Sequence, residues 1–430
     1  MHYENAEKEN DRFASIKTWL VCAILVCIIF SLLVPCSIGI ILLTGIWVFE
    51  GDLRRKWFIL KNDPLFIGYS LYFLTQLAGI VYAQDIVIGW KNVETKLGFL
   101  VLPMIFCSSN FVEDQARKNI MTVTSVTLTV ASLYCFAIAY NHFLHDHNRS
   151  DFFYHQLLDP IDQHAVYFSV YVFVGILFLW WDGKNLKWLR RFPIIRIIWI
   201  AYLVILIYFL ASKLVISILV IYFAFILARS FIKRFRKWQV LAILTILFLF
   251  IGSLFTFNNP VRQRFSDLVN FNRKSVYKEK FNAGDYFNGI EFRLLLWPVS
   301  LGVLRDNHAF LFGVGSSNTQ SLLAKKFLDM GLYAGDKSKN DHGYLDYNCH
   351  NQFLQISLQS GIVGLIIFIF WCVTILKMTW QRNEIILSGI VMVIFIFFLT
   401  ESVFEREFGM ILCTVFPLLY LYPKKEYFHS

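Results

Sequence analysis

Long apolar segments follow one another along most of this chain of 430 residues, and they constrain its fold more than any other feature. A membrane-spanning helix needs about 17–25 mostly apolar residues, and a shorter run suffices where neighbouring helices cover its ends. By this criterion we predict about twelve spans, at residues 16–34, 37–49, 64–82, 97–107, 120–140, 165–181, 194–210, 214–227, 240–257, 353–375, 385–399 and 409–421. The sequence therefore predicts an all-α polytopic membrane protein.

The composition supports this class. Apolar residues make up 57% of the chain and charged residues 16%, against about 45–50% and 25% in soluble domains. The 44 Phe, 20 Tyr and 12 Trp argue against a disordered chain, which lacks bulky side chains to fill an interior. The 8 cysteines show neither a disulfide framework nor a CxxC metal spacing, and only Cys349 lies in a long polar stretch.

The net charge of +10 raises the question of nucleic acid, but the positions of the charges indicate a membrane topology instead. Cytoplasmic loops retain Lys and Arg during insertion. With the N-terminus inside, 23 Lys and Arg fall on the cytoplasmic side, and 5 fall in the short outer segments, at Lys91, Lys96, Arg149, Lys213 and Arg406. We therefore expect both termini in the cytoplasm, a retained first helix and no nucleic-acid partner.

One polar segment breaks the pattern of short loops. Residues 258–351 lie between the ninth and tenth predicted spans and fall on the outer side. A loop of this length is usually functional or disordered, and the apolar spacing over residues 291–305 favours a buried amphipathic helix over disorder. The predicted domains are transmembrane helices 1–9 in residues 1–257, one large outer loop in 258–351, and transmembrane helices 10–12 in 352–430.

Cations gather in and near this outer loop. Arg262 and Arg264 follow the ninth predicted span, Arg293 opens the amphipathic helix, and Lys213 stands between two apolar runs. A charge at membrane depth costs at least about 2.5–3.5 kcal/mol unless it is paired or hydrated, which makes Lys213 a functional candidate. Each cation also has a structural interpretation: snorkelling for Lys213, interface anchoring for Arg262 and Arg264, and an internal ion pair with Glu291 or a nearby acid for Arg293.

Polar residues at the ends of other predicted spans complete the set of candidates. His350 and Asn351 precede the tenth span, where a His can act as a general base, an effect worth about 10²–10⁴-fold. His164 opens the sixth span, and Glu401 lies between the eleventh and twelfth. These residues either line one outward cavity with His350 or serve as structural hydrogen-bonding groups and ion pairs.

Signatures of other enzyme classes are weak or missing. The sequence has no HExxH, nucleophile-elbow or DxD-type motif. The run Gly313-Val314-Gly315 is followed by no Lys-Ser/Thr, so it favours a turn over a phosphate-binding loop. Nucleotide hydrolysis and metal-dependent chemistry are therefore not expected.

Several motifs in the second half of the chain occur in the order and topology of a known family. They are Glu291-Phe292-Arg293-Leu294-Leu295-Leu296-Trp297, then Phe312-Gly313-Val314-Gly315, then His350-Asn351-Gln352-Phe353-Leu354 and Gly361-Ile362-Val363-Gly364. In these features the chain resembles the O-antigen ligase and polymerase superfamily of integral membrane glycosyltransferases. The resemblance is clearest over residues 210–421 and implies a GT-C-like architecture with about twelve helices and one large periplasmic loop.

The resemblance also implies a function. The expected protein lies in the bacterial inner membrane and uses an undecaprenyl-pyrophosphate-linked glycan as donor at the periplasmic face. His350 and Arg293 map onto key residues of the ligases, and Ser212-Lys213 stands where they carry Ser-Arg. A Lys attracts a diphosphate but lacks the bidentate fork of Arg. Neither a metal nor another cofactor is expected.

The hypothesis is a single inverting displacement. Arg293, with Lys213 and Arg262 or Arg264, would hold the diphosphate while His350 deprotonates the acceptor hydroxyl. Other expected substrate-binding residues are Asn351, His164 and Glu401. The acceptor would be another lipid-linked glycan, lipid A-core or a protein, and the sequence leaves ligase and polymerase open.

Two other classes compete with the enzyme. A polysaccharide exporter or lipid-linked oligosaccharide flippase would also need many helices and cations, but it would distribute charges through its spans. A receptor or sensor that binds a ligand through its outer loop would leave His350 dispensable. The gathering of polar residues on one side favours surface chemistry.

Overall fold

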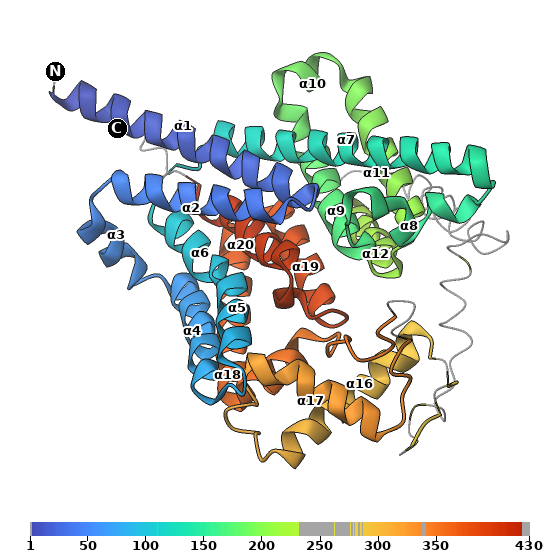
Figure 1. Ribbon diagram of the computed structural model, residues 1–430. Coiled ribbons are helices and arrows are strands. Elements are labelled where there is room, and N and C mark those ends of the chain that lie inside the picture. Colours follow the sequence, from blue (N-terminus) through green and yellow to red (C-terminus); the bar gives the residue numbers. More distant parts are fainter. Residues whose placement is uncertain are drawn as a thin grey trace. The chain divides into compact units, whose positions relative to one another are not determined.

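The structure is a computed structural model (Figure 1), and it describes residues 2–423 apart from residues 110, 232–261, 263–275, 277, 279, 283, 286 and 337–340. Regular secondary structure in this described part is helical, and one isolated β-bridge joins Asp336 to Asp341. The chain divides into two compact units. The first comprises residues 1–20, 37–117 and 270–430, and the second comprises residues 21–36 and 118–269.

Three helices contribute residues to both units: α1 (His2–Ile29), α2 (Leu33–Phe49) and α7 (Asp114–Asp146). The second unit also contains α8 (Tyr154–Leu158), α9 (Ala165–Trp181), α10 (Lys187–Arg191), α11 (Pro193–Leu210) and α12 (Lys213–Phe231). Within this unit α9 packs against α8, α11 and α12, and nearly all of its side chains are buried. This burial explains why the α9 sequence is apolar on every side rather than on one face.

The first unit holds the candidate site. Its helices are α3 (Leu53–Leu60), α4 (Pro64–Ala78), α5 (Ile86–Lys96), α6 (Gly98–Ser108), α16 (Gly289–Asp306), α17 (Ser316–Asp329), α18 (Gln352–Arg382), α19 (Ile385–Phe398) and α20 (Glu407–Leu421). Helix α18 packs against α4 and α19, and α20 packs against α6 and α19. Aromatic rings fill this interface, with Phe404 contacting Tyr72, Phe99, Trp371 and Phe398.

Helices suited to a membrane are numerous. Within the described residues, five helical segments are long and apolar enough to span a membrane: Arg12–Ile29, Pro64–Tyr82, Asp114–Asp146, Pro193–Leu210 and Gln352–Arg382. Two bent pairs raise the number to seven if each pair is one span. Each predicted span overlaps a described helix, except residues 240–257, which lie outside the described residues. The protein is therefore a multi-pass helical membrane protein, and the count of twelve spans stays a prediction.

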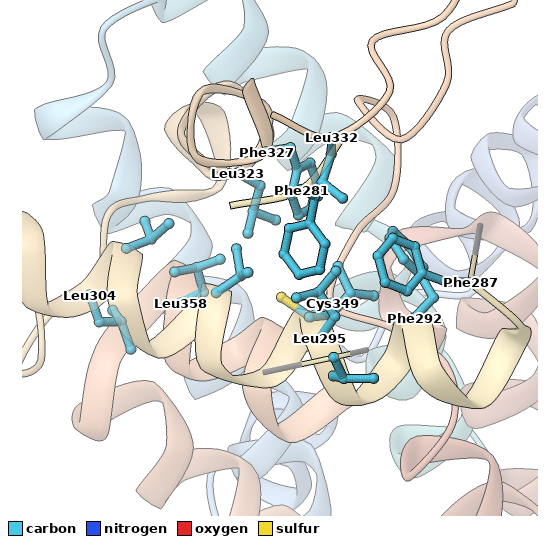
Figure 2. Close-up of a cluster of buried hydrophobic side chains, with 14 of the residues drawn as sticks. Phe281, Phe287, Phe292, Leu295, Leu304, Leu323, Phe327, Leu332, Cys349 and Leu358 are labelled. Atoms are coloured by element: carbon cyan, nitrogen blue, oxygen red, sulfur yellow. The ribbon is translucent and has the colours of Figure 1, made fainter. Parts of the chain in front are cut away.

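The predicted amphipathic helix over 291–305 is present as α16. Its buried face includes Phe292, Leu295, Leu296 and Val299. These side chains join residues of α17, the start of α18 and the segment around Phe281 in one apolar cluster (Figure 2). The cluster shows what holds α16 and α17 together: the two helices bury a common apolar core.

Helix α18 is broken at Gly361, where φ is 62° and ψ is −158°. This backbone conformation is essentially restricted to glycine. A Cβ on Gly361 would also lie 2.3 Å from the carbonyl oxygen of Leu311. The backbone of Leu311 and Phe312, which is not helical, therefore approaches α18 closely at Gly361.

Residues 310–315 form hydrogen bonds with the backbone amide and carbonyl groups of α18 that have lost their helical partners at this break. The amides of Val314 and Gly315 donate to the carbonyl oxygens of Leu358 and Gln359 at 2.8 and 3.0 Å. Beyond the break, the amide of Ile362 donates to the carbonyl oxygen of Phe310 at 2.9 Å. The Gly313-Val314-Gly315 run follows a turn at residues 310–312 and is tied by two of its amides to the first third of α18.

Candidate active site

The N-terminus of α16 is fixed by a capping box. The side chain of Asn288 accepts hydrogen bonds from the amides of Ile290 and Glu291, and the Glu291 carboxylate accepts one from the amide of Asn288. Reciprocal capping of this kind satisfies amides that lack helical partners. It also sets the position of Arg293, which lies one turn further along α16.

Arg293 reaches the segment between α19 and α20. Its Nη2 lies 2.7 Å from Oε1 of Glu401, and its Nε donates to the carbonyl oxygen of Thr400 at 3.0 Å. Its Nη1 donates to the carbonyl oxygen of Gly289 at 2.9 Å. The guanidinium group has five N–H donors, so these three contacts leave two without an acceptor among the described protein groups. Arg293 thus forms an ion pair, and the partner that the structure shows is Glu401, 108 residues further along the chain.

His350 contacts the other oxygen of the same carboxylate. Its Nδ1 lies 2.8 Å from Oε2 of Glu401. An ionised carboxylate only accepts hydrogen bonds, so Nδ1 is the donor, and in the neutral form of the ring Nε2 is the nitrogen that can accept a proton. The arrangement resembles the carboxylate–imidazole pair of a catalytic triad, in which the carboxylate fixes the tautomer and orientation of the base.

The backbone at His350 has an unusual conformation. His350 has φ 43°, a value that residues other than glycine seldom adopt, and its amide donates to Oδ1 of Asn348 at 2.9 Å. The ring of Tyr347 lies 5.5 Å from the imidazole. Asn351 then caps α18: its Oδ1 accepts from the amide of Leu354 at 3.1 Å, and its Nδ2 donates to the carbonyl oxygen of Leu399 at 3.3 Å.

Exposure increases from the centre of this group outward. The exposed fraction of the side chain is 9% for Glu401, 20% for His350 and 34% for Arg293. The carboxylate is therefore shielded from water, while the imidazole and the guanidinium remain accessible. Such a group can accept a proton at Nε2 and offer N–H donors to an anion.

The structure brings four of the eight predicted site residues together in the first unit: Arg293, His350, Asn351 and Glu401. His164 and Lys213 belong to the second unit. His164 precedes α9 and contacts the rings of His155 and Tyr167, and Lys213 is the half-buried first residue of α12. Arg262 is exposed in the second unit, and Arg264 lies outside the described residues.

A second polar group in the first unit is one that the sequence interpretation missed. Lys96 ends α5 and is 2% exposed, and its Nζ lies 3.1 Å from Oε1 of Glu405. The same Nζ donates to Oε1 of Gln76 and of Gln359, at 3.0 and 3.3 Å. From the sequence, Lys96 was predicted only to be one of the cations in the short outer segments. The spacing of Gln352, Gln355 and Gln359 was the available signal, because it places three amides on one face of an apolar helix.

Across the described residues, no group of three or more His, Cys, Asp or Glu side chains is placed to hold a metal ion. The site is instead built from a base, a carboxylate and a cation.

The sequence of part of the chain matches a known family. Residues 200–369 match the sequence model of the O-antigen ligase family. The chain carries an O-antigen ligase domain. Comparison with curated proteins found no match. Proteins of this family are membrane enzymes of surface polysaccharide synthesis, and the resemblance predicted from the motifs is confirmed over the matched residues.

The O-antigen ligase domain includes Lys213, Arg293, His350 and Asn351 but ends before Glu401. The carboxylate that contacts both Arg293 and His350 is therefore contributed by a part of the chain that follows the domain. Within the domain, Arg293 lies in α16, and His350 and Asn351 immediately precede α18.

Proposed function

We propose that this protein transfers a glycan from an undecaprenyl-pyrophosphate-linked donor to an acceptor hydroxyl, at the periplasmic face of the bacterial inner membrane. The observation that carries the proposal is the contact of His350 Nδ1 with a buried carboxylate, which leaves Nε2 as a proton acceptor. The O-antigen ligase domain supplies the class of substrate, a lipid-linked glycan. The excess of Lys and Arg in the segments assigned to the cytoplasm supports the orientation.

The reaction we propose is one displacement at the anomeric carbon. The acceptor oxygen forms a bond to that carbon as His350 Nε2 takes the hydroxyl proton. The bond between the carbon and the pyrophosphate oxygen breaks, and undecaprenyl pyrophosphate leaves with the electron pair. The configuration at the anomeric carbon is inverted, and neither a covalent enzyme intermediate nor a metal is required.

Glu401 and Arg293 have separate roles in this scheme. Glu401 keeps His350 in the tautomer that accepts a proton at Nε2, and it stabilises the imidazolium that forms. Arg293 holds Glu401 through Nη2 and has N–H donors left for the pyrophosphate, whose negative charge grows as the bond breaks. Both oxygens of Glu401 are engaged by the protein, which favours a positioning role over direct substrate binding.

The remaining candidates complete the proposal on chemical grounds alone. Lys213, Arg262 and Arg264 are proposed as further cations for the pyrophosphate because of their charge, and Lys213 also through the family resemblance. Asn351 and His164 are proposed as hydrogen-bonding groups for a glycan. The acceptor would be lipid A-core, a second lipid-linked glycan or a protein.

The experiment is complementation of a strain that lacks the gene. Wild type, His350→Ala and the control His342→Ala are expressed at equal levels in the membrane, and surface polysaccharide is examined on a gel. His342 is 63% exposed, so its replacement should leave transfer intact. We expect His350→Ala to lower transfer by about 10²–10⁴-fold, because the general base is removed.

The gel also separates the alternatives. Loss of the whole ladder from the core indicates a ligase, and a single capped repeat indicates a polymerase. A wild-type ladder from His350→Ala would exclude His350 as the base. An unchanged profile in the strain without the gene would contradict the proposed function as a whole.

A further inference from the structure

Two acidic residues lie four positions apart in the segment that joins α19 to α20. Glu401 contacts His350 and Arg293, and Glu405 forms an ion pair with Lys96. The exposed fraction of the side chain is 3% for Lys96 and 21% for Glu405. The segment that places Glu401 against His350 is therefore held by two cations, Arg293 at Glu401 and Lys96 at Glu405.

The first half of α18 connects the two ion pairs. Gln352, Gln355 and Gln359 recur at helical spacing on one buried face and are at most 3% exposed. Oε1 of Gln352 accepts a hydrogen bond from the amide of Phe404 at 2.8 Å, and Gln359 accepts one from Lys96. The side chains of these glutamines thus lie along residues 401–405, between His350 and Lys96.

The surroundings of Lys96 are polar in an otherwise apolar bundle. Gln76 accepts from Lys96 and its Nε2 donates to Oγ of Ser360 at 3.3 Å, next to the break at Gly361. The hydroxyl of Tyr72 on α4 is also buried and has no hydrogen-bond partner among the residues that the structure describes. Buried ionisable groups among membrane helices are costly and therefore mark function more often than simple stability.

We propose that Lys96 is a positioning residue of the active site, which holds Glu405 and thereby places Glu401 against His350. This inference rests on the proposed function and adds a residue outside the matched domain to it. Without the ammonium group, the Glu405 carboxylate would face an apolar bundle with no countercharge. It would turn toward water and carry the 401–405 segment with it, which would separate Glu401 from His350.

The test compares two lysines on the same helix. Lys96→Met removes the buried cation, and Lys91→Met makes the same chemical change at an exposed position of α5. Both are purified in the full chain, returned to vesicles and supplied with donor lipid extracted from the strain without the gene. That strain's membranes provide the acceptor. Initial rates of transfer are divided by the number of donor-binding sites in the sample, so that a smaller amount of folded protein does not lower the measured kcat.

We expect Lys96→Met to lower kcat by about 10–100-fold, because a small misplacement of a catalytic group has an effect of this size. The KM for the donor should change little, and Lys91→Met should match wild type. Lys96→Arg, which keeps a cation and N–H donors, should recover most of the activity. A general loosening of the bundle would not be rescued by the bulkier Arg.

A second variant covers the case in which Lys96→Met fails to fold. Glu405→Gln keeps the size of the side chain and removes the ion pair at a partly exposed position, and it should also lower kcat with little change in KM. If Lys96→Met or Glu405→Gln is as active as Lys91→Met while His350→Ala is inactive, the inference is wrong and the proposed function stands. If His350→Ala is active, the proposed function itself fails.

Discussion

At the scale of single residues, Glu401 is the centre of the site, since one carboxylate contacts both the base and a cation. Replacing the Glu401 carboxylate by an amide of the same size tests the effect of its charge without altering the packing. Glu401→Gln should lower the rate of transfer by roughly 10²–10⁴-fold, because an amide no longer fixes the tautomer of His350 or stabilises its protonated form. The measurement is the initial rate in vesicles with extracted donor lipid.

The control for this prediction is Glu94→Gln, which makes the same change at an exposed position of α5. It should transfer glycan at the wild-type rate. Wild-type activity from Glu401→Gln would show that the contact with His350 has no part in the reaction.

Sequence reasoning predicted His350, Arg293 and Glu401 as candidates but not their contacts. Glu401 lies 51 residues after His350 and 108 after Arg293, and only the packing of α16, α18 and α19 brings them together. The ion pair of Lys96 was missed for the same reason, because Glu405 is 309 residues away in the chain. Residue types therefore indicate chemistry, while partners depend on the tertiary structure.

At the scale of elements, the apolar pattern predicted helices well. Residues 165–181 coincide with α9, and the amphipathic spacing over 291–305 lies within α16. Helix α17 was not predicted, because its first turn is a polar run from Ser316 to Gln320 and its burial comes from contacts with α16. The break in α18 was not predicted either, because a glycine within an apolar run is compatible with a continuous helix as well as with a break.

This break yields an element-scale prediction. Gly361→Ala places a Cβ against the Leu311 carbonyl and requires a backbone conformation that only glycine tolerates, so it should destabilise the protein by about 1–3 kcal/mol or more. Gly45→Ala is the matched control: a Cβ there meets nothing within 4 Å, and Ala favours a helix such as α2. Thermal unfolding in detergent should show a lower midpoint for Gly361→Ala only, and equal midpoints would contradict the break.

At the scale of the whole molecule, the cysteines permit a direct test of orientation. All eight lie among the described residues, seven are buried and Cys27 is half-buried, and no disulfide links them. Burial raises the pKa of Cys349 to about 12, so this thiol stays protonated and unreactive near neutral pH. The folded wild-type chain should therefore react slowly with a membrane-impermeant maleimide.

New cysteines at exposed positions then report the side of the membrane. Lys278→Cys lies in the predicted periplasmic loop and should be labelled in intact spheroplasts, whereas Arg54→Cys lies in a predicted cytoplasmic loop and should be labelled only after permeabilisation. The reverse pattern would invert the topology and place His350 on the cytoplasmic face.

The contact between residues 310–315 and α18 also restricts how this sequence can change over generations. A Cβ on Gly313 would lie 2.4 Å from the backbone of Gln359, just as one on Gly361 would meet Leu311. Neither glycine can be replaced while this contact persists, because each added Cβ would clash with main-chain atoms, which remain whatever side chains surround them. A lineage that loses one of them must rebuild the loop and the helix together, so the pair should be inherited as a unit even where the surrounding side chains diverge.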